Sequence, residues 1–291
     1  MILVDANSIC HQAKHTMGNL SWNEKKVGVI FGFFNQILSL AKIFETNKFI
    51  FAWDSRKSLR TVLFPDYKKQ RRYEKSPEEK ELDTIAYMQF DTVRQELLPE
   101  LGFVNSFMIE GYEADDLIAS ITFTNPNKEF FIISTDEDLY QLLSDNVRMY
   151  SIKKKQFFMN RNLWKEYGIT PDEWAEVKSI AGCDTDGVPG VKGVGEKTAC
   201  LYINRHLNVT HKSYHNIQKS KELIEHNRKL VTLPLEGTPE ITLSAKNNLS
   251  LTSFQDICNR YGFQSFLEQE RYKQWKEFVF MKGNSDGPSS R

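Results

Sequence analysis

The sequence predicts an α/β fold with a central, mostly parallel sheet flanked by helices. Short apolar runs occur at 1–6 (MILVDA), 48–54 (KFIFAWD), 103–109 (FVNSFMI) and 129–136 (EFFIISTD), and segments of helical pattern separate them. Near-continuous apolar strands that alternate with helices are typical of a parallel sheet covered on both faces. The chain of 291 residues is long enough for a large core.

The helical segments follow in order along the chain. We expect helices over about 26–46, 77–98, 113–124, 138–143 and 171–182; the second starts at a Ser-Pro pair followed by glutamates. After residue 186, GVPGVKGVGEKTACLYI predicts a glycine-punctuated hairpin that leads into a helix. We therefore expect a core at 1–186, a mostly helical part at 187–282 and a disordered polar tail at 283–291.

Composition restricts the protein class. The 38 basic and 38 acidic residues give no net charge, and 40% hydrophobic content is ordinary for a globular protein. No apolar run approaches the length of a membrane span, and the N-terminus has the pattern of a strand and not of a signal peptide. The four scattered cysteines indicate reduced thiols and a cytoplasmic protein, and the His11–His15 pair lacks the context of a zinc site.

Carboxylates gather at the predicted strand ends and helix starts. Ligands of an open parallel sheet bind beyond the carboxyl ends of its strands, where Asp5, Asp54 and Asp136 each end an apolar run. The motifs GYEADD and GCDTDG add further acids. We expect nine carboxylates to converge there: Asp5, Asp54, Glu113, Asp115, Asp116, Asp136, Asp138, Asp184 and Asp186.

Each acid alone could be a surface residue or a helix cap. As a set, they would raise each other's pKa and destabilise the fold unless cations balanced them. Ligand sets made only of oxygen favour Mg²⁺ or Mn²⁺, and two such ions can clamp the attacking and leaving oxygens of a phosphodiester. The sequence therefore predicts two or more divalent ions and phosphodiester hydrolysis.

Basic residues and glycines suit a polyanionic substrate. Removing the nine acids leaves 29 acidic residues against 38 basic ones. The segment 65–75 (PDYKKQRRYEK) combines Lys68, Lys69, Arg71 and Arg72 with tyrosines, including Tyr67, on which unpaired bases could stack. A solvated charge run is the alternative interpretation.

The glycine-rich segment that follows GCDTD is a second candidate for phosphate contact. Glycines let a backbone approach phosphate closely, and a helix N-terminus adds N–H donors, whereas a plain structural turn is the alternative. The sequence contains no GxxxxGK[ST] motif. The predicted contacts are Gly190, Lys192, Gly193, Gly195 and Lys197.

Five ordered motifs carry a family resemblance over about residues 1–235. LVDANS, FAWDSRKSLR…PDYKKQRR, EGYEADDLIAS, ISTDEDLYQLL and GCDTDGVPGVKGVGEKTA resemble the 5′-nuclease (flap endonuclease) family. The pattern is most similar to bacterial and bacteriophage 5′–3′ exonucleases, including the N-terminal nuclease domain of bacterial DNA polymerase I. The resemblance implies a structure-specific enzyme that uses divalent metals to cut branched or 5′-ended DNA in replication or repair.

The resemblance also implies residue roles. The first seven predicted acids, Asp5 to Asp138, match the family's metal-binding acids. Tyr67, Lys68 and Arg71 match the start of a helical arch, here about 67–98, that admits the single-stranded 5′ arm. Lys68 would assist at the scissile phosphate, and Asp54 and Asp136 would be catalytic.

The C-terminal part has its own implied roles. Residues 187–206 resemble a helix–hairpin–helix variant that holds duplex DNA and binds a monovalent cation, here K⁺. Arg228 lies in a similar basic segment, 226–234 (HNRKLVTLP). We expect a stand-alone monomeric nuclease, since no polymerase domain follows, that acts on 5′ flaps, 5′ overhangs or nicks in a bacterial or phage-infected cell.

One motif departs from the family pattern G-D-x-x-D-N. Cys183 stands at the first acidic position and Asp186 at the second, while Asp184 is displaced by one residue and Gly187 replaces the asparagine. Either Asp184 moves in, or the second metal is held more loosely.

Three rival functions stay open at this point. Cys183 keeps open a non-catalytic branched-DNA-binding protein, which Mg²⁺-dependent cleavage of a flap substrate would exclude. A phosphatase with Asp5 as nucleophile predicts turnover of small phosphate esters. An RNase is a third, since such a site does not reveal from sequence whether it reads the 2′-OH.

Overall fold

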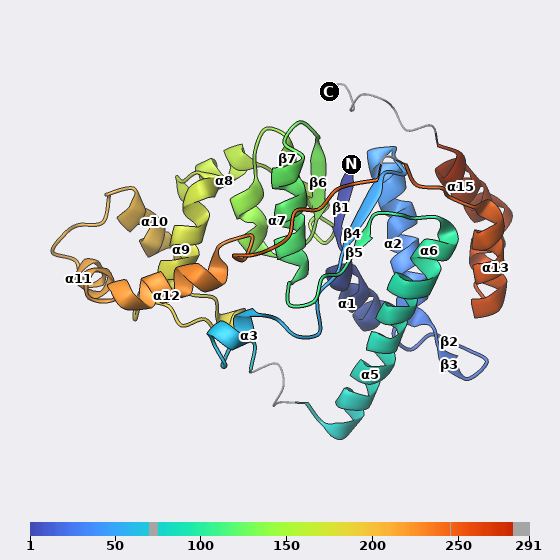
Figure 1. Cartoon of the computed structure of the whole chain (residues 1–291), viewed down its shortest axis with the longest axis horizontal. Coiled ribbons are helices and arrows are strands. Elements are labelled where there is room, and N and C mark those ends of the chain that lie inside the picture. The colour runs from blue at the N-terminus through green and yellow to red at the C-terminus, as the bar shows by residue number, and fades with distance from the viewer. Residues whose placement is uncertain (70–74, 245, 282–291) are drawn as a thin grey trace. The chain divides into compact units, whose positions relative to one another are not determined.

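The computed structural model describes residues 1–69, 75–244 and 246–281. These residues form two compact units (Figure 1). Of the described residues, unit 1 comprises 1–53, 75–107, 242–244 and 246–281, and unit 2 comprises 54–69 and 108–241. These bounds differ from the predicted boundary after residue 186, because the last three helices pack with the N-terminal segment.

Three parallel strands form the centre of unit 1. β1 (Ile2–Asp5) pairs with β4 (Phe49–Ala52), and β4 pairs with β5 (Ser106–Phe107). All residues of β1 and β4 are buried, as the apolar runs predict. The predicted strand 103–109 is shorter than expected. The helix α1 (Ala6–Met17) was not predicted; it begins at once after β1 because Asp5 caps it.

Helices cover these strands. α2 (Gly28–Phe44) packs beside α1, and a short hairpin of β2 (Ser21–Trp22) and β3 (Lys25–Lys26) joins the two. α5 (Pro77–Thr92) starts at the predicted Ser-Pro pair, where the structure shows a capping box, and runs through a π-helical turn (Val93–Leu97) into α6 (Leu98–Leu101), as one rod in Figure 1. Buried Gln89 accepts hydrogen bonds from the N–H groups of Val29 (3.0 Å) and Ile30 (3.4 Å), so α5 caps the start of α2.

The chain's last helices complete unit 1. They are α13 (Leu251–Tyr261), α14 (Gln264–Leu267) and α15 (Gln269–Phe280). Trp275 of α15 stacks on Phe254 of α13 at 4.0 Å between ring centroids and meets Phe34 of α2 edge-on. This aromatic packing attaches α13 and α15 to α2.

Unit 2 has its own strands. β6 (Phe130–Ile133) and β7 (Val147–Ser151) are parallel, and β8 (Gln156–Phe158) pairs antiparallel with β7. α7 (Ala114–Thr124) precedes β6, and the predicted helix over 138–143 is the 3₁₀ helix η2 (Glu137–Leu142). β7 was not predicted, because the alternation of apolar and polar residues in its sequence, VRMYS, is weak.

The rest of unit 2 is helical. α3 (Arg60–Leu63) and α8 (Asn160–Tyr167) are short; η3 (Pro171–Glu173) leads into α9 (Trp174–Ala181), and η4 (Asp184–Asp186) follows it. α10 (Glu196–Ile203), α11 (Lys212–Lys219) and α12 (Lys221–Val231) come last. In the part of the chain that the structure describes, no helix is both long and apolar enough to span a membrane.

The glycine-rich loop between η4 and α10 is held in place by contacts with α9 and α12. Asn227 of α12 is fully buried, and its amide donates to the carbonyls of Ser179 (3.0 Å) and Pro189 (2.7 Å). Gly190 packs so closely on α9 that an added Cβ would lie 1.9 Å from the carbonyl oxygen of Ala181. An added Cβ at Gly195 would meet no atom of the described residues within 4 Å.

Substitutions at these two glycines should change the stability by different amounts. Gly190→Ala should lower the free energy of unfolding by about 1–3 kcal/mol, because the methyl group forces the loop away from α9. Gly195→Ala is the matched control and should change it by less than about 0.5 kcal/mol. Urea unfolding followed by circular dichroism measures both. Equal effects of the two substitutions would show that the loop is not packed as described.

Candidate active site

The start of α7 holds the first group of predicted acids. Glu113 is the N-cap residue of α7 and is 7% exposed. Asp54, which follows β4, accepts a hydrogen bond from the Ala114 N–H at 2.8 Å. Asp115 lies in the first turn of α7 and is half-buried. The partial positive charge of the helix N-terminus therefore stabilises these carboxylates.

Asp116 is placed differently from the expectation that it presents an oxygen to a metal. Its Oδ1 accepts from Arg60 Nη2 (2.7 Å) and Leu235 N (2.8 Å), and its Oδ2 accepts from Arg60 Nη1 (2.6 Å) and Glu113 N (3.0 Å). These four hydrogen bonds use the capacity of a carboxylate, and the residue is fully buried. Asp116 therefore positions the N-terminus of α7 and Glu113.

Arg60 is the cation of this buried pair. It is 2% exposed, and its Nε donates to the carbonyl of Leu230 at 2.7 Å. Burial alone would lower the pKa of the guanidinium, but the hydrogen bonds and charge of Asp116 outweigh burial and raise it. Arg60 thus joins α3 to α7 by an ion pair and to α12 by a hydrogen bond.

Lys68 and Tyr67 connect Glu113 with the second group of acids. Lys68 Nζ lies 2.8 Å from Glu113 Oε1 and 3.9 Å from Asp186 Oδ2. The Tyr67 hydroxyl donates toward Glu113 Oε2 (2.8 Å) and also lies 3.1 Å from Asp186 Oδ2. Burial would lower the pKa of Lys68, but the carboxylates of Glu113, Asp186 and Asp54 outweigh it and raise the pKa. Lys68 is therefore a fixed positive charge within the acidic region.

The backbone at Lys68 is held in an uncommon conformation. Its φ of 54° lies in the left-handed region, which a non-glycine residue adopts at an energetic cost. The Lys68 N–H donates to the carbonyl of Asp186 at 2.8 Å, which ties the two segments together. Such local strain is typical of a functional position.

Asp138, Cys183 and Asp186 form the second group. One ligand atom from each lies within 4.8 Å of the other two. Asp138 Oδ1 is buried and accepts no hydrogen bond from the described residues, although Lys178 Nζ lies 3.2 Å away, outside hydrogen-bonding geometry. Burial and the charge of Asp136 raise the pKa of Asp138 to about 6. A buried oxygen without a hydrogen bond suits a site for a cation.

The loop after α9 decides which acid joins this group. The structure brings Asp186 to Asp138 and Cys183, whereas Asp184 is exposed and lies outside the group. The main chain of Cys183 pairs with that of Val188 in both directions (2.9 and 3.0 Å). Burial and the charge of Asp138 raise the pKa of the Cys183 thiol.

Asp136 and Asp5 both cap helices. Asp136 Oδ1 accepts from the Asp138 N–H at 2.9 Å at the start of η2. Asp5, in unit 1, caps α1 by accepting from the Ser8 N–H at 2.9 Å. Each cap involves one oxygen of its carboxylate, so the capping and metal-binding interpretations are compatible.

The predicted DNA-binding residues fall into distinct settings. Tyr67 is 4% exposed and packs with Val188, Leu230 and Val231, so it offers no open ring face for a base, contrary to expectation. Lys69 is exposed and pairs with Asp66 at 2.8 Å. Arg71 and Arg72 lie outside the described residues.

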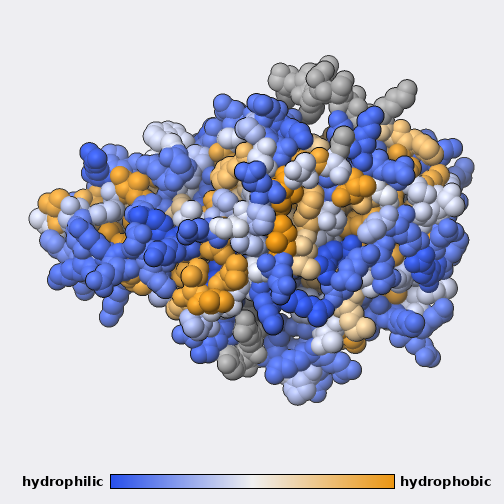
Figure 2. Space-filling model, viewed as in Figure 1, coloured by the Kyte–Doolittle hydropathy of each residue, from blue (hydrophilic) through white to orange (hydrophobic). Residues whose placement is uncertain are grey.

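The glycine-rich loop and α12 hold the other predicted DNA contacts. Lys192, Gly193, Gly195 and Lys197 are exposed, whereas Gly190 is a packing residue. Arg228 forms ion pairs with Glu176 and Glu225. The surface around α11 and α12 is largely hydrophilic in Figure 2, and Lys212, Lys219, Lys221 and Lys229 are exposed there.

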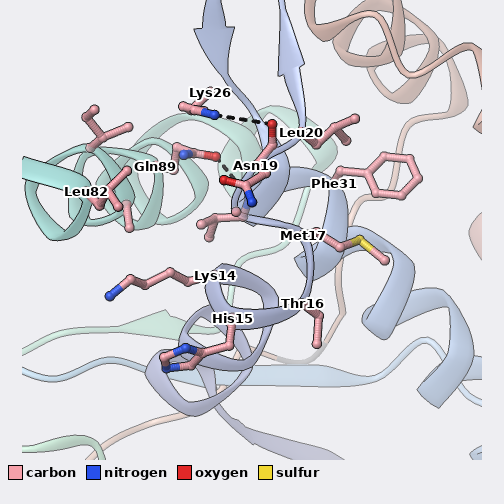
Figure 3. A pocket seen from close by; sticks show the side chains of 14 residues that line it. Lys14, His15, Thr16, Met17, Asn19, Leu20, Lys26, Phe31, Leu82 and Gln89 are labelled. Atoms are coloured by element: carbon pink, nitrogen blue, oxygen red, sulfur yellow. Dashed lines mark hydrogen bonds between the residues drawn. The ribbon is translucent and has the colours of Figure 1, made fainter. Parts of the chain in front are cut away.

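A separate pocket of about 450 Å³ lies in unit 1 (Figure 3). Lys14 and His15 of α1 face Leu82 and Gln89 of α5 across it. The described residues that line it include no carboxylate and none of the predicted site residues. The pocket therefore contributes nothing to the predicted chemistry.

Sequence reasoning missed two buried cations of the site, Arg60 and Lys178. Lys178 is 7% exposed and bonds Glu196 at 2.9 Å. It lies one helical turn after buried Trp174, so a lysine on the apolar face of α9 was the signal. Arg60 stands among the apolar residues of SLRTVLF, which is a similar but weaker signal.

The Arg60–Asp116 pair predicts a large loss of stability when it is broken. Arg60→Met should lower the free energy of unfolding by about 3–5 kcal/mol, because it leaves a buried carboxylate uncompensated. Arg260→Met, which removes an exposed pair with Glu100, should cost at most about 1 kcal/mol. Denaturant unfolding measures both, and a loss for Arg60→Met no larger than for the control would contradict the buried pair.

Comparison with known proteins places the chain. A family model described as "5'-3' exonuclease, N-terminal resolvase-like domain" matches residues 1–168. The 5′–3′ exonuclease of Buchnera aphidicola (subsp. Acyrthosiphon pisum) is 29% identical over 248 residues, which are 84% of this chain and 83% of that protein. The thermostable DNA polymerase I of Thermus aquaticus is 31% identical over 205 residues, 68% of this chain but 23% of the polymerase.

Solved structures show the same fold. A T5 5′-exonuclease structure with bound zinc has a TM-score of 0.70 at 23% identity and covers 97% of this chain and 98% of its own. The prediction of an α/β fold with a mostly parallel sheet flanked by helices is confirmed. Several relatives are 5′–3′ exonucleases by name, which supports the catalytic interpretation over a non-catalytic one. The chain belongs to the 5′–3′ exonuclease family, as the order of its acidic motifs predicts.

Proposed function

We propose that this nuclease hydrolyses phosphodiesters of DNA with a 5′ flap, 5′ overhang or nick, with the help of Mg²⁺ or Mn²⁺. One observation carries the proposal: in unit 2 the Lys68 ammonium lies between the carboxylates of Glu113 and Asp186, and Asp186 in turn lies beside Asp138. Related structures support it, since a T5 flap endonuclease is in a complex with DNA and metal ions, and Rad2 is in a complex with DNA substrate.

The residues present fit divalent ions. One ion would be held by Asp54 after β4 together with Glu113 and Asp115 at the start of α7. Another would be held by Asp136, Asp138 and Asp186. Asp5 is a further candidate from the sequence. Carboxylate oxygens suit Mg²⁺ and Mn²⁺, and the buried Asp138 Oδ1 accepts no hydrogen bond from residues that the structure describes. Bound there, such ions would activate a water and neutralise charge at the phosphate.

Lys68 would act on the scissile phosphate itself. Its ammonium is held between Glu113 and Asp186, and its side chain remains 24% exposed. A phosphate oxygen at this place would gain a charge-assisted hydrogen bond, which strengthens as negative charge develops. Asp116 and Arg60 position Glu113, and through it the ammonium, without touching the substrate.

Duplex DNA would contact the loop before α10. The Gly193 and Gly195 backbone is open to a ligand, and Lys192 and Lys197 flank it. Arg228, the K⁺ site and Lys69 are proposed as further parts of this surface. The monomeric state, the cytoplasmic location and a role in replication or repair are part of the same proposal.

Cleavage of a labelled 5′-flap substrate tests the function. Wild-type protein should release the flap with Mg²⁺ and not in EDTA. Asp54→Asn and Asp136→Asn should abolish cleavage while DNA affinity stays the same or rises, because they remove negative charge. Full activity of either variant would count against the metal assignment, and DNA binding without cleavage in any dication would favour a non-catalytic protein.

Lys68 and its neighbour Lys69 form a matched pair of variants. Lys68→Ala should slow single-turnover cleavage by about 10²–10³-fold, the typical effect of losing one preorganised donor to developing charge. Lys69→Ala should weaken DNA affinity slightly and leave the chemical step near wild type. If Lys68→Ala reduced affinity and rate equally, Lys68 would be only a phosphate anchor.

A further inference from the structure

A sulfur atom stands within the second carboxylate group. Cys183 Sγ lies within 4.8 Å of ligand oxygens of both Asp138 and Asp186. We propose that Cys183 is itself a metal ligand, so that this site binds a first-row transition-metal dication, such as Mn²⁺, Co²⁺ or Zn²⁺, in preference to Mg²⁺. The inference rests on the proposed function in placing a divalent ion at this group.

The spacing is close to that of one shared ion. With metal–oxygen bonds of about 2.1 Å and metal–sulfur bonds of about 2.3 Å, two ligand atoms of one tetrahedral ion lie about 3.4–3.6 Å apart. Side-chain rotations that shorten the present separations by at most about 1.4 Å therefore bring all three atoms into range. The main chain of this loop is held by the hydrogen bonds between Cys183 and Val188 and by the hydrogen bond from the Lys68 N–H to the Asp186 carbonyl.

A second observation points to the same ion. Asp138 Oδ1 is buried and accepts no hydrogen bond within the described part of the chain, which is costly for a carboxylate oxygen. The Lys178 ammonium lies 3.2 Å from Asp138 Oδ1 and compensates the charge of the carboxylate. The same ammonium also forms an ion pair with Glu196 at 2.9 Å. An arriving dication can therefore take the place of the ammonium at Asp138 while Lys178 keeps Glu196 as partner.

The chemistry of the thiolate sets the preference. Carboxylates suit Mg²⁺, whereas thiolate is a soft ligand that Mg²⁺ disfavours and that Zn²⁺ and its neighbours accept. As the metal–sulfur bond forms, the thiol proton leaves to solvent. The competing interpretation is that Cys183 only packs: it borders the apolar cluster of Tyr67 and Val188, and its Sγ lies 3.2 Å from Thr185 Oγ1.

Cobalt spectroscopy on the full chain separates the two interpretations. Metal-free protein titrated with Co²⁺ should develop the near-ultraviolet absorption of sulfur-to-cobalt charge transfer, from one thiolate per chain. Cys183→Ser should lose this band, while Cys200→Ser, at a buried cysteine in α10, should retain it. Absence of the band in the wild type, or its retention in Cys183→Ser, would overturn the proposal.

Cys183→Asp gives a second readout that does not need the serine variant to fold. Calorimetric titration should show that the ratio of Mn²⁺ to Mg²⁺ affinity falls by at least about tenfold in Cys183→Asp. An unchanged ratio would overturn the proposal. Flap cleavage without the cobalt band would reject Cys183 as ligand but keep the nuclease function, and the band without cleavage in any dication would reject the function but keep the site.

Discussion

The site depends on compensation of negative charge that is crowded into a partly buried region. Carboxylates this close repel each other strongly in a low-dielectric interior, so the fold needs cations beside them. The protein supplies Arg60 to Asp116, Lys68 to Glu113 and Asp186, and Lys178 to Asp138. Of these, the Arg60 pair has saturated hydrogen bonds and is structural. The other two ammonium groups share their carboxylates and are the contacts that divalent ions can replace.

Strand ends and helix starts explain why the acids collect where they do. Asp54 bonds the first turn of α7, Glu113 caps α7, and Asp136 caps η2. A helix N-terminus favours a carboxylate on its own account, so folding places these groups before any ligand binds. Helix capping and metal binding are thus two uses of the same side chains, and the positions that the fold requires are those that the chemistry needs.

The sequence predicted the acids better than their partners. Asp54 and Asp136 stand out because each follows an apolar run, and α5 because of its Ser-Pro start followed by glutamates. Arg60 was missed because a lone arginine near a chain turn resembles a surface residue in the sequence. Only the structure reveals its hydrogen bond to Asp116. The return of the C-terminal helices to unit 1 also escaped prediction, since the Trp275–Phe254 and Phe34 contacts link distant segments that no local pattern reveals.

The most direct measurement is a crystal structure in Mn²⁺ with anomalous scattering recorded at the manganese edge. The account predicts anomalous peaks within coordination distance of Glu113 and of the Asp138, Cys183 and Asp186 group. It also predicts that the Lys68 ammonium withdraws from Glu113 and that the Lys178 ammonium withdraws from Asp138. Anomalous peaks confined to other surfaces, with both lysine contacts intact at saturating Mn²⁺, would contradict it.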